Sequence, residues 1–382
     1  MLLNSLAVII ALCLYIIKPF KFVKLCIIIY SRIGHLAGNT DLFLRRLQLE
    51  KPTKDKKILY VGISGKPANE QLLRMFQRKM PILQNDFAAD ILNKSVLQRT
   101  VFCVRLPNNS NEYYEYNNTE PNLSFTADEE NRGKELLSNM GIDNSSWFVC
   151  FHARDTVYMD KHNDYHNRED DKHNDYRNSD IKNYLEAAKY ISSCDGYAVR
   201  MGYGVLEELP DLNNPRIIDY ASYHQTDFGD IYLPAKCKYF LASPSGLWGI
   251  PLIFHVPVVC VNFIHFHTPL RKGDLFIPKK VWSIDKKRFL TFLEILEFEG
   301  GVYQYSEYYT EAGLEVIENT AEEILDVAQE MNERLNGTYQ STEEDEDLQN
   351  RFHNLFQPHH IVYGTPARVG ARFLRQNKEL LE

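Results

Sequence analysis

The sequence predicts an α/β fold with two domains that each contain a parallel sheet. Its 382 residues are enough for two such domains. Short β-branched apolar runs, such as residues 22–30 and 147–152, alternate with stretches of helical periodicity such as residues 181–193. Strands that alternate with helices imply parallel pairing, because the helix returns the chain to the starting end of the sheet.

The first half of the chain opens with a strand, a glycine-containing turn and a helix. The turn is expected at residues 31–39 and the helix at residues 41–47. Residues 108–122 are rich in Asn, Tyr and Glu without any period, which predicts a surface loop. The further elements expected in this half are a strand at 57–63 and helices at 68–78 and 129–140.

The second half repeats the alternation more clearly. The expected strands are residues 147–152, 196–202, 216–220, 238–242 and 256–262, and the expected helices are residues 181–193, 228–235 and 247–254. A polar insert at residues 161–180 contains a short near-duplication. The acidic stretch at residues 342–347 predicts a linker, and residues 367–381 predict a helix that packs back on the first domain.

Composition indicates an ordinary globular protein without a nucleic-acid footprint. Charged residues make up 25% of the chain, and 43 basic against 51 acidic side chains give a net charge of −8. An anionic ligand must therefore be held by a local cluster of arginines and helix N-termini. Seven cysteines without a CxxC pair indicate reduced thiols and a cytoplasmic location.

Residues 1–19 form an apolar N-terminal segment. The apolar run is shorter than the roughly 20 residues of a spanning helix. The basic residues Lys18 and Lys21 follow the run instead of preceding it, which argues against a secretory signal. Two interpretations stay open: Leu2–Ile17 contacts the inner face of a membrane, or it forms a buried first helix.

Polar residues follow three of the predicted strands in the second half. Arg154 follows the strand at 147–152, and Arg200 lies in the strand at 196–202. Ser243, Ser245 and Gly246 follow the strand at 238–242 and precede a predicted helix. Ligands of parallel sheets bind at the carboxyl ends of strands, and arginine binds phosphate through paired hydrogen bonds. These residues predict a diphosphate site without a metal. The alternative is that the two arginines pair with Asp155 and Asp219.

Several short motifs occur in an order that resembles a bacterial family of glycosyltransferases of the GT-B type. The His-x-Arg motif is also distantly similar to a donor motif of fucosyltransferases. The motifs are Arg32-Ile33-Gly34-His35, His152-Ala153-Arg154-Asp155, Tyr176-Arg177-Asn178-Ser179-Asp180, Arg200-Met201-Gly202, Asp227-Phe228-Gly229-Asp230-Ile231-Tyr232 and Ser243-Pro244-Ser245-Gly246-Leu247.

The resemblance covers nearly the whole chain and implies two Rossmann-like domains facing an inter-domain cleft. Residues 20–144 would form the acceptor domain and residues 145–339 the nucleotide-sugar donor domain. Residues 340–382 would form the acidic linker and the C-terminal helix. Two departures from the family pattern are the duplication in the insert and Pro244, which lacks an N–H group.

The resemblance also implies roles for individual residues. Arg154 and Arg200 would neutralise the donor diphosphate, and Ser243, Ser245 and Gly246 would donate hydrogen bonds to it. An inverting transfer needs a base, for which His35 is the first candidate and Asp155 the second. The residues expected to order the donor loop or touch the donor sugar, with a loop-capping network as the alternative, are His152, Tyr176, Arg177, Asn178 and Asp180.

The resulting expectation is a glycosyltransferase that moves a sugar from a nucleotide-diphosphate donor to a glycan or lipid-linked acceptor in surface polysaccharide biosynthesis. It would need no cofactor besides the nucleotide-sugar co-substrate. One alternative is a non-catalytic nucleotide- or glycan-binding protein of the same fold. Another is a metal-dependent hydrolase that uses His162, His166 and His173 of the insert, although these residues lie in a segment typical of a solvated loop.

Overall fold

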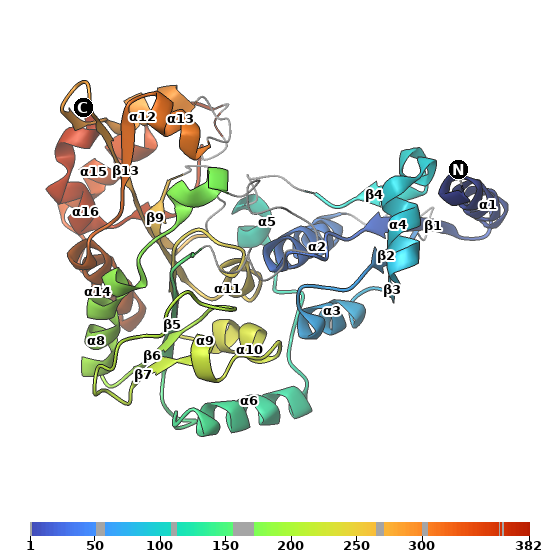
Figure 1. Ribbon diagram of the computed structural model, residues 1–382, viewed down its shortest axis with the longest axis horizontal. Coiled ribbons are helices and arrows are strands. Elements are labelled where there is room, and N and C mark those ends of the chain that lie inside the picture. The colour runs from blue at the N-terminus through green and yellow to red at the C-terminus, as the bar shows by residue number, and fades with distance from the viewer. Residues whose placement is uncertain are drawn as a thin grey trace. The chain divides into compact units, whose positions relative to one another are not determined.

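The computed structural model describes residues 2–50, 58–107, 113–155, 172–264, 271–299, 305–358, 360 and 363–382. The chain divides into two compact units (Figure 1). Unit 1 comprises Met1–Glu130 and Ile253–His255, and unit 2 comprises Asn131–Leu252 and Val256–Glu382. None of the described helices is long and apolar enough to cross a membrane.

Unit 1 contains a four-stranded parallel sheet with the order β3-β2-β1-β4. A helix connects each strand to the next along the chain, so that the strands are parallel. The first three strands follow one another across the sheet and β4 pairs with the other side of β1, so the strand order reverses between β1 and β4. The strands are β1 (Phe22–Ile27), β2 (Ile58–Ser64), β3 (Ile82–Gln84) and β4 (Cys103–Arg105). The helices are α1 (Leu2–Ile17), α2 (Ile33–Leu49), α3 (Glu70–Gln77), α4 (Asp86–Lys94), α5 (Tyr113–Asn118) and the beginning of α6 (Ala127–Asn139), with the 3₁₀ turn η1 (Val96–Arg99).

Two elements of unit 1 differ from the sequence prediction. The predicted turn at residues 31–39 is mostly helical, because α2 begins at Ile33. Burial of Leu36 and Ala37 outweighs the low helix propensity of the glycines on either side. The predicted loop at residues 108–122 contains helix α5, whose Tyr116 is buried with its ring 4.6 Å from the guanidinium of Arg45.

Unit 2 contains a seven-stranded parallel sheet with the order β14-β10-β9-β8-β5-β6-β7. Strand order therefore reverses between β5 and β8, as in doubly wound nucleotide-binding folds. Both sheets confirm the predicted α/β class with Rossmann-like parallel sheets, whereas a cleft between the units stays a prediction. The strands are β5 (Phe148–His152), β6 (Tyr197–Arg200), β7 (Ile217–Asp219), β8 (Phe240–Ala242), β9 (Val258–Phe263), β10 (Leu275–Pro278) and β14 (Arg368–Val369).

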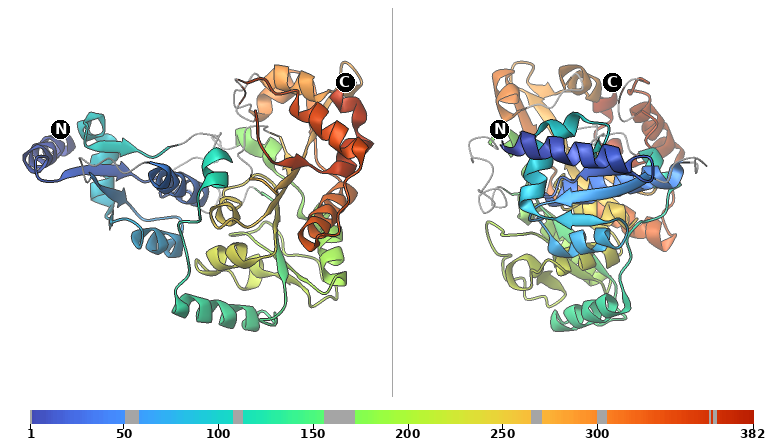
Figure 2. Two further views of the ribbon diagram at one scale, coloured as in Figure 1. Left: turned by 180° about the vertical axis from the view of Figure 1, so that it is seen from behind. Right: turned by 90° about the vertical axis from the view of Figure 1, so that its right-hand side faces the viewer.

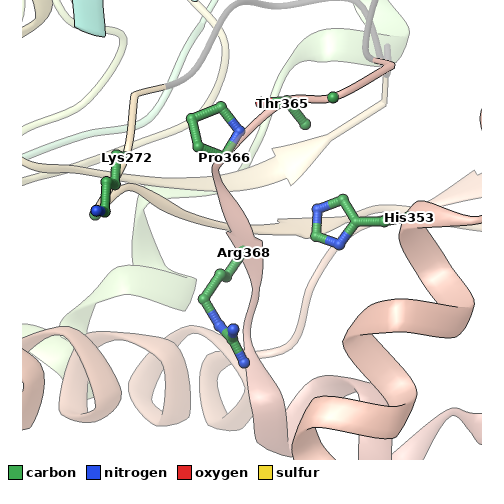
Figure 3. A pocket seen from close by; sticks show the side chains of 7 residues that line it. Lys272, His353, Thr365, Pro366 and Arg368 are labelled. Atoms are coloured by element: carbon green, nitrogen blue, oxygen red, sulfur yellow. The ribbon is translucent and has the colours of Figure 1, made fainter. Parts of the chain in front are cut away.

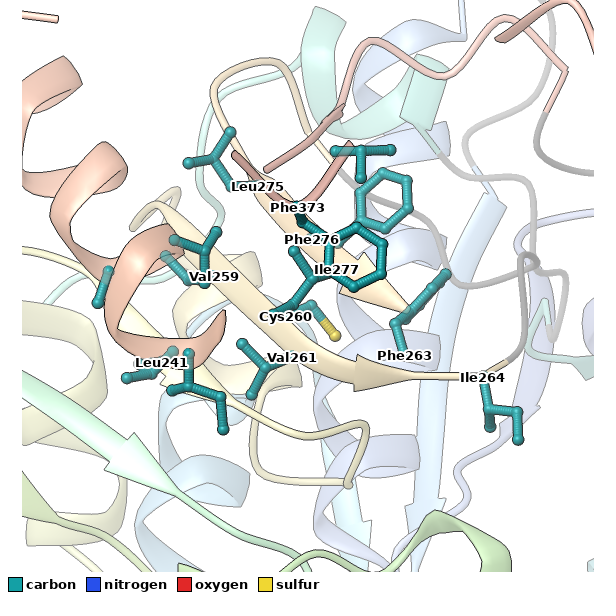
Figure 4. Packing of buried hydrophobic residues seen from close by; sticks show 14 of the residues in the cluster. Leu241, Val259, Cys260, Val261, Phe263, Ile264, Leu275, Phe276, Ile277 and Phe373 are labelled. Carbon is teal, nitrogen blue, oxygen red and sulfur yellow. The ribbon is translucent and has the colours of Figure 1, made fainter. Parts of the chain in front are cut away.

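The core of unit 2 explains why these runs become strands. Val259, Val261 and Phe276 are almost fully buried, with side chains of β8, β9 and β10 packed between the sheet and its helices (Figure 4). Both faces of the sheet are covered, so the strands read as continuous apolar runs. The helices are α8 (Leu185–Ser193), α9 (Tyr220–Tyr223), α10 (Gly229–Lys236), α11 (Gly249–Ile253), α12 (Phe292–Glu299), α13 (Ser306–Glu311) and α14 (Ala321–Asn336). A small antiparallel sheet combines β11 (Lys280–Ser283), β12 (Arg288–Phe289) and β13 (Leu314–Ile317).

The C-terminal part of the chain corrects one prediction. The acidic stretch at residues 342–347 is no linker, because it begins helix α15 (Glu343–His353). Thr342 and Asp345 form a capping box, and acidic side chains favour the first turn of a helix. Helix α16 (Ala371–Gln376) packs against α14 and α15, and Phe373 joins the core of unit 2. Its predicted packing on the first domain stays a prediction.

Candidate functional site

The carboxyl ends of β5 and β8 lie at the reversal of strand order in unit 2, and Arg154 and Ser243 of the predicted diphosphate site lie there. Arg154 follows β5 by two residues, and its backbone N–H donates to Oγ of Ser243, 2.8 Å away, at the end of β8. The Arg154 side chain donates from Nη1 to Oδ1 of Asn178. The structure therefore brings Arg154, Ser243 and Asn178 together at the position where doubly wound sheets bind ligands.

Two polar atoms at this edge are buried without a hydrogen-bond partner among the described residues. They are Nε of Arg177 and Oγ of Ser245. Arg177 also donates from Nη2 to the carbonyl oxygen of Pro244, 3.3 Å away, so its guanidinium lies at the turn that carries Ser245. An unpaired buried polar atom costs about 1–3 kcal/mol. Both atoms can donate, and a ligand rich in acceptor oxygens would satisfy them.

Lys279 adds a third cation to this edge. It follows β10 and is buried, and its Nζ donates to the carbonyl oxygens of Tyr176 at 3.0 Å and Asn178 at 2.6 Å. Burial lowers the pKa of Lys279 to about 8, Glu318 opposes this change, and the charge of Arg154 adds to it. The two hydrogen bonds from the Lys279 ammonium hold the loop that carries Arg177 in place. The sequence prediction missed Lys279, although it follows an apolar strand in the same way as Arg154.

A polar layer beneath the site holds Ser243 in place. The hydroxyl of Tyr184 lies 3.2 Å from Oγ of Ser179 and 3.3 Å from Nδ2 of Asn262, which donates to it. Its hydrogen bonds also include Ser243, and burial raises the pKa of Tyr184 to about 12. Asn262 and Asn319 exchange backbone-to-side-chain hydrogen bonds of 2.6 and 2.7 Å. Ser243 therefore serves the scaffold, while Ser245 is the serine with an unused hydroxyl.

Arg200 does not join this cluster. Its Nη1 lies 3.2 Å from Oδ2 of Asp219, and both side chains are buried. The same Nη1 donates to the carbonyl oxygen of Glu207 at 2.7 Å. Arg200 and Asp219 are direct neighbours in the β6–β7 register. Its guanidinium takes part in the structural ion pair that the sequence suggested as the alternative to phosphate binding.

The loop residues of the predicted donor motif divide between scaffold and site. Tyr176 is buried with its ring centre 5.4 Å from that of Tyr309. Asp180 accepts from the backbone N–H of Lys182 and begins a 3₁₀ turn. Nδ1 of His152 lies 3.0 Å from the carbonyl oxygen of Met201, and burial lowers the pKa of His152. Of the predicted donor-loop residues, Arg177 and Asn178 are the ones with side chains at the cluster.

The expected helix start after Ser243 is corrected by the structure. Helix α11 begins at Gly249 and contains five residues, where a helix over residues 247–254 was predicted. Gly246 is exposed and precedes that helix, so Ser243, Ser245 and Gly246 are not the first residues of α11. Any ligand here would be held by side chains of the loop more than by a helix dipole.

The two candidate bases lie in different units. In unit 2, Oδ2 of Asp155 accepts from the backbone N–H of Leu206, 3.2 Å away. In unit 1, His35 lies in the first turn of α2, with Nδ1 3.0 Å from Oδ1 of Asn39. Asn39 in turn donates to the carbonyl oxygen of Pro107, just after β4. His35 is thereby linked to the reversal of strand order between β1 and β4, the position at which doubly wound sheets generally bind ligands.

The metal-site alternative cannot be placed on the fold. His162 and His166 lie outside the described residues, and the side chain of His173 does too. Within the described residues, no three His, Cys, Asp or Glu side chains gather as a metal site would require.

A hollow lies at the opposite edge of the unit 2 sheet, before β10 and β14 (Figure 3). Its volume is about 490 Å³. The ring nitrogens of His353 face the carbonyl oxygens of Gln349 and Ala367 at 2.9 and 3.1 Å, and the guanidinium of Arg368 is bound by Glu346. These contacts stabilise the fold. The lining residues are Lys272, Gly273, His353, Gly364, Thr365, Pro366 and Arg368.

Comparison with known proteins gives no family. No family model matches the chain, and no curated protein matches it. Among solved structures, it is similar to the ADP-heptose lipopolysaccharide heptosyltransferase II of E. coli, with 13% identity, a TM-score of 0.40, and coverage of 62% of this chain and 84% of that one.

Two further solved structures resemble the chain to a similar degree. A family 9 glycosyltransferase of Veillonella parvula has 12% identity and a TM-score of 0.38, with coverage of 63% and 79%. The iron-containing dodecameric glycosyltransferase TibC of enterotoxigenic E. coli has 13% identity and a TM-score of 0.34, with coverage of 65% and 61%. Similarities of this size carry no argument about the activity of this chain, which must rest on its own residues.

Proposed function

We propose that the protein is a glycosyltransferase that binds a nucleotide-diphosphate sugar at the carboxyl edge of the unit 2 sheet. The observation that carries the proposal is the pair of unsatisfied buried donors, Nε of Arg177 and Oγ of Ser245, beside Arg154 and Lys279. Three cations and a free hydroxyl at a reversal of strand order suit a diphosphate.

The cluster would act mainly on the leaving group. In the transfer, the bond between the anomeric carbon and the diphosphate oxygen breaks, and the electron pair stays on the diphosphate. The acceptor hydroxyl oxygen bonds to the anomeric carbon and gives its proton to a base. Fixed guanidinium and ammonium groups stabilise the negative charge that develops on the leaving oxygen, so the proposed reaction needs no metal.

The base remains a choice between His35 and Asp155. Imidazole and carboxylate groups both serve as general bases, and His35 belongs to the unit that is proposed to bind the acceptor. A His35→Gln variant that loses turnover but keeps donor affinity would identify His35 as the base. The same result in Asp155→Asn, with His35→Gln active, would assign the role to Asp155.

The finer proposals are a glycan or lipid-linked acceptor, a role in surface polysaccharide biosynthesis and a cytoplasmic location at the inner face of the membrane. The E. coli structural neighbour is described as an ADP-heptose transferase. The first panel of donors should contain adenosine diphosphate sugars together with uridine, guanosine and cytidine nucleotides.

Release of nucleoside diphosphate from such a panel tests the proposal. The wild-type protein should release the diphosphate of one donor, and Arg177→Ala should abolish the release. Arg216→Ala is the matched control, because Arg216 forms an exposed ion pair with Asp195 in the same unit. Affinity for the donor without release, in the presence of a glycan acceptor, would identify a non-catalytic binding protein instead. Absence of both affinity and release would refute the proposal.

A further inference from the structure

Helix α1 is apolar on all sides but is packed on one side only. Its inward face places Leu3, Ala7 and Ile10 against the neighbouring helix α4 and turn η1 of unit 1. Ala7 is fully buried there. The backbone N–H of Val96 also donates to Oδ1 of Asn4, 3.0 Å away, which fixes the helix on the unit. This face explains why the segment folds as a helix of unit 1.

The outward face of α1 is equally apolar. Leu2, Ile9, Leu12 and Ile16 follow one another at helical spacing and are more than half exposed, Ile16 to 72%. The apolar stripe continues in Phe20, which is 89% exposed. A helix that is hydrophobic all round is normally buried on all sides, and contiguous exposed apolar surface marks an interaction site. Helix α1 is seen along the face of unit 1 in Figure 2.

The charges around this face identify the kind of partner. Residues 1–40 contain no Asp or Glu, although the chain as a whole has a net charge of −8. Lys18, Lys21 and Lys24 follow α1 directly. The ammonium of Lys18 lies 5.7 Å from the ring centre of Tyr15 and 5.2 Å from that of Phe22. Aromatic rings with lysines at one end of an apolar helix suit the boundary between acyl chains and headgroups.

A second copy of this chain fits the face less well. Two copies joined through α1 would bring the lysines of both N-terminal segments into one region, and residues 1–40 contain no acidic residue to compensate for them. An anionic lipid surface supplies both an apolar layer and the opposite charge. The charge pattern therefore favours lipid over a homodimer.

We propose that the outward face of α1 docks unit 1 on an anionic membrane surface. The helix would lie in the plane of the interface, with Leu12 and Ile16 among the acyl chains and Lys18 and Lys21 at the phosphates. The inward face keeps its contacts with unit 1 in the docked state. This inference rests on the membrane location named under the proposed function and not on the donor site, which belongs to unit 2, so vesicle binding and nucleotide release test the two separately.

Sedimentation with lipid vesicles tests the proposal. We would compare vesicles of phosphatidylcholine alone with vesicles that contain about one third phosphatidylglycerol. The wild-type protein should bind the anionic vesicles more tightly, and the binding should weaken as salt rises from about 0.05 to about 0.5 M. Lys18→Gln and Lys21→Gln should each weaken binding to anionic vesicles by about fivefold.

A double variant of the outward face tests the contribution of its apolar side chains to vesicle binding. Leu12→Glu with Ile16→Glu should abolish binding to both kinds of vesicle, while its melting temperature should match that of the wild type because both side chains are exposed. Leu206→Glu is the control, since Leu206 is an exposed leucine of unit 2. Equal vesicle binding by the double variant and the wild type would overturn the proposal. A wild-type protein that binds no vesicles would also overturn the proposal. If that protein is a dimer that dissociates in the double variant, the outward face of α1 is an interface between two copies of the chain instead.

Discussion

Two neighbouring places on the carboxyl edge of the unit 2 sheet carry arginines, and they differ in what the guanidinium groups contact. At the β6–β7 end, Arg200 is paired with the buried carboxylate of Asp219. At the β5–β8 end, Arg154 and Arg177 contact Asn178 and the Pro244 carbonyl, and the Ser245 hydroxyl has no hydrogen-bond partner among the described residues. At the first place the protein itself supplies the counter-charge of the arginine. At the second place Nε of Arg177 and Oγ of Ser245 are buried donors without a partner among the described residues.

This difference separates a structural arginine from an arginine that is proposed to bind a ligand. Arg154 and Arg200 both lie at strand ends, where ligands of parallel sheets bind. The reversal of strand order lies between β5 and β8, and the β6–β7 pair is removed from it by one strand. A position at the reversal and a buried donor without a hydrogen-bond partner among the described residues together point to Arg177 and Ser245 more sharply than the strand-end rule alone.

The largest expected effect is on stability at the β6–β7 end. Arg200→Met should lower the free energy of unfolding by about 3 kcal/mol or more, because it leaves the buried Asp219 carboxylate without its cation. Arg154→Met removes the side-chain hydrogen bond to Asn178 and should cost about 1 kcal/mol. Urea denaturation of both variants measures the contrast. If both variants lost the same free energy of unfolding, the distinction between the two places would be contradicted.

The next effect is on affinity at the β5–β8 end. Arg177→Ala should weaken nucleoside diphosphate binding about 10- to 100-fold, as expected for hydrogen bonds to a charged group. Arg177→Lys should restore little of this, because an ammonium lacks the Nε–H of the guanidinium fork. Isothermal titration calorimetry measures both values. Wild-type affinity in Arg177→Ala would contradict the site.

The two serines of the turn should respond in opposite directions. Ser243→Ala should lower the free energy of unfolding by about 1 kcal/mol, because its hydroxyl accepts from Arg154. Ser245→Ala should leave stability unchanged or raise it by up to about 1 kcal/mol, because it removes an unsatisfied hydroxyl. Thermal and urea unfolding without ligand compare them. A loss of stability in Ser245→Ala as large as in Ser243→Ala would show that this hydroxyl already serves the fold.

The smallest effect concerns pH. The folded pKa of Lys279, about 8, lies below the ordinary value of 10.5. The unfolded chain therefore binds more protons between these values, and Lys279 makes the free energy of unfolding rise with pH in that window. Diphosphate affinity should change the other way and fall several-fold from about pH 7 to about pH 9 as the site loses a positive charge. Lys279→Met should flatten both profiles, and unchanged profiles would contradict this assignment.

Sequence reasoning located much of this edge because strand ends can be read from apolar runs. It placed Arg154, Ser243 and Ser245 correctly after their strands. It could not separate Arg154 from Arg200, because the pairing of Arg200 with Asp219 depends on the register of β6 against β7. Lys279 was missed because β10 had not been assigned as a strand. The start of α2 was misplaced because packing of Leu36 and Ala37 overrides the glycines around them.

The most direct test of the central claim is the melting temperature of the protein with millimolar ADP, UDP, GDP or CDP. It compares the wild type with Arg177→Ala, Ser245→Ala and the control Arg216→Ala. A ligand at about 100 times its dissociation constant adds about 2.7 kcal/mol of stability. We predict that one nucleotide raises the melting temperature of the wild type and the control, raises that of Ser245→Ala less, and leaves that of Arg177→Ala unchanged. No shift in the wild type, or an equal shift in Arg177→Ala, would contradict a diphosphate site at the β5–β8 edge.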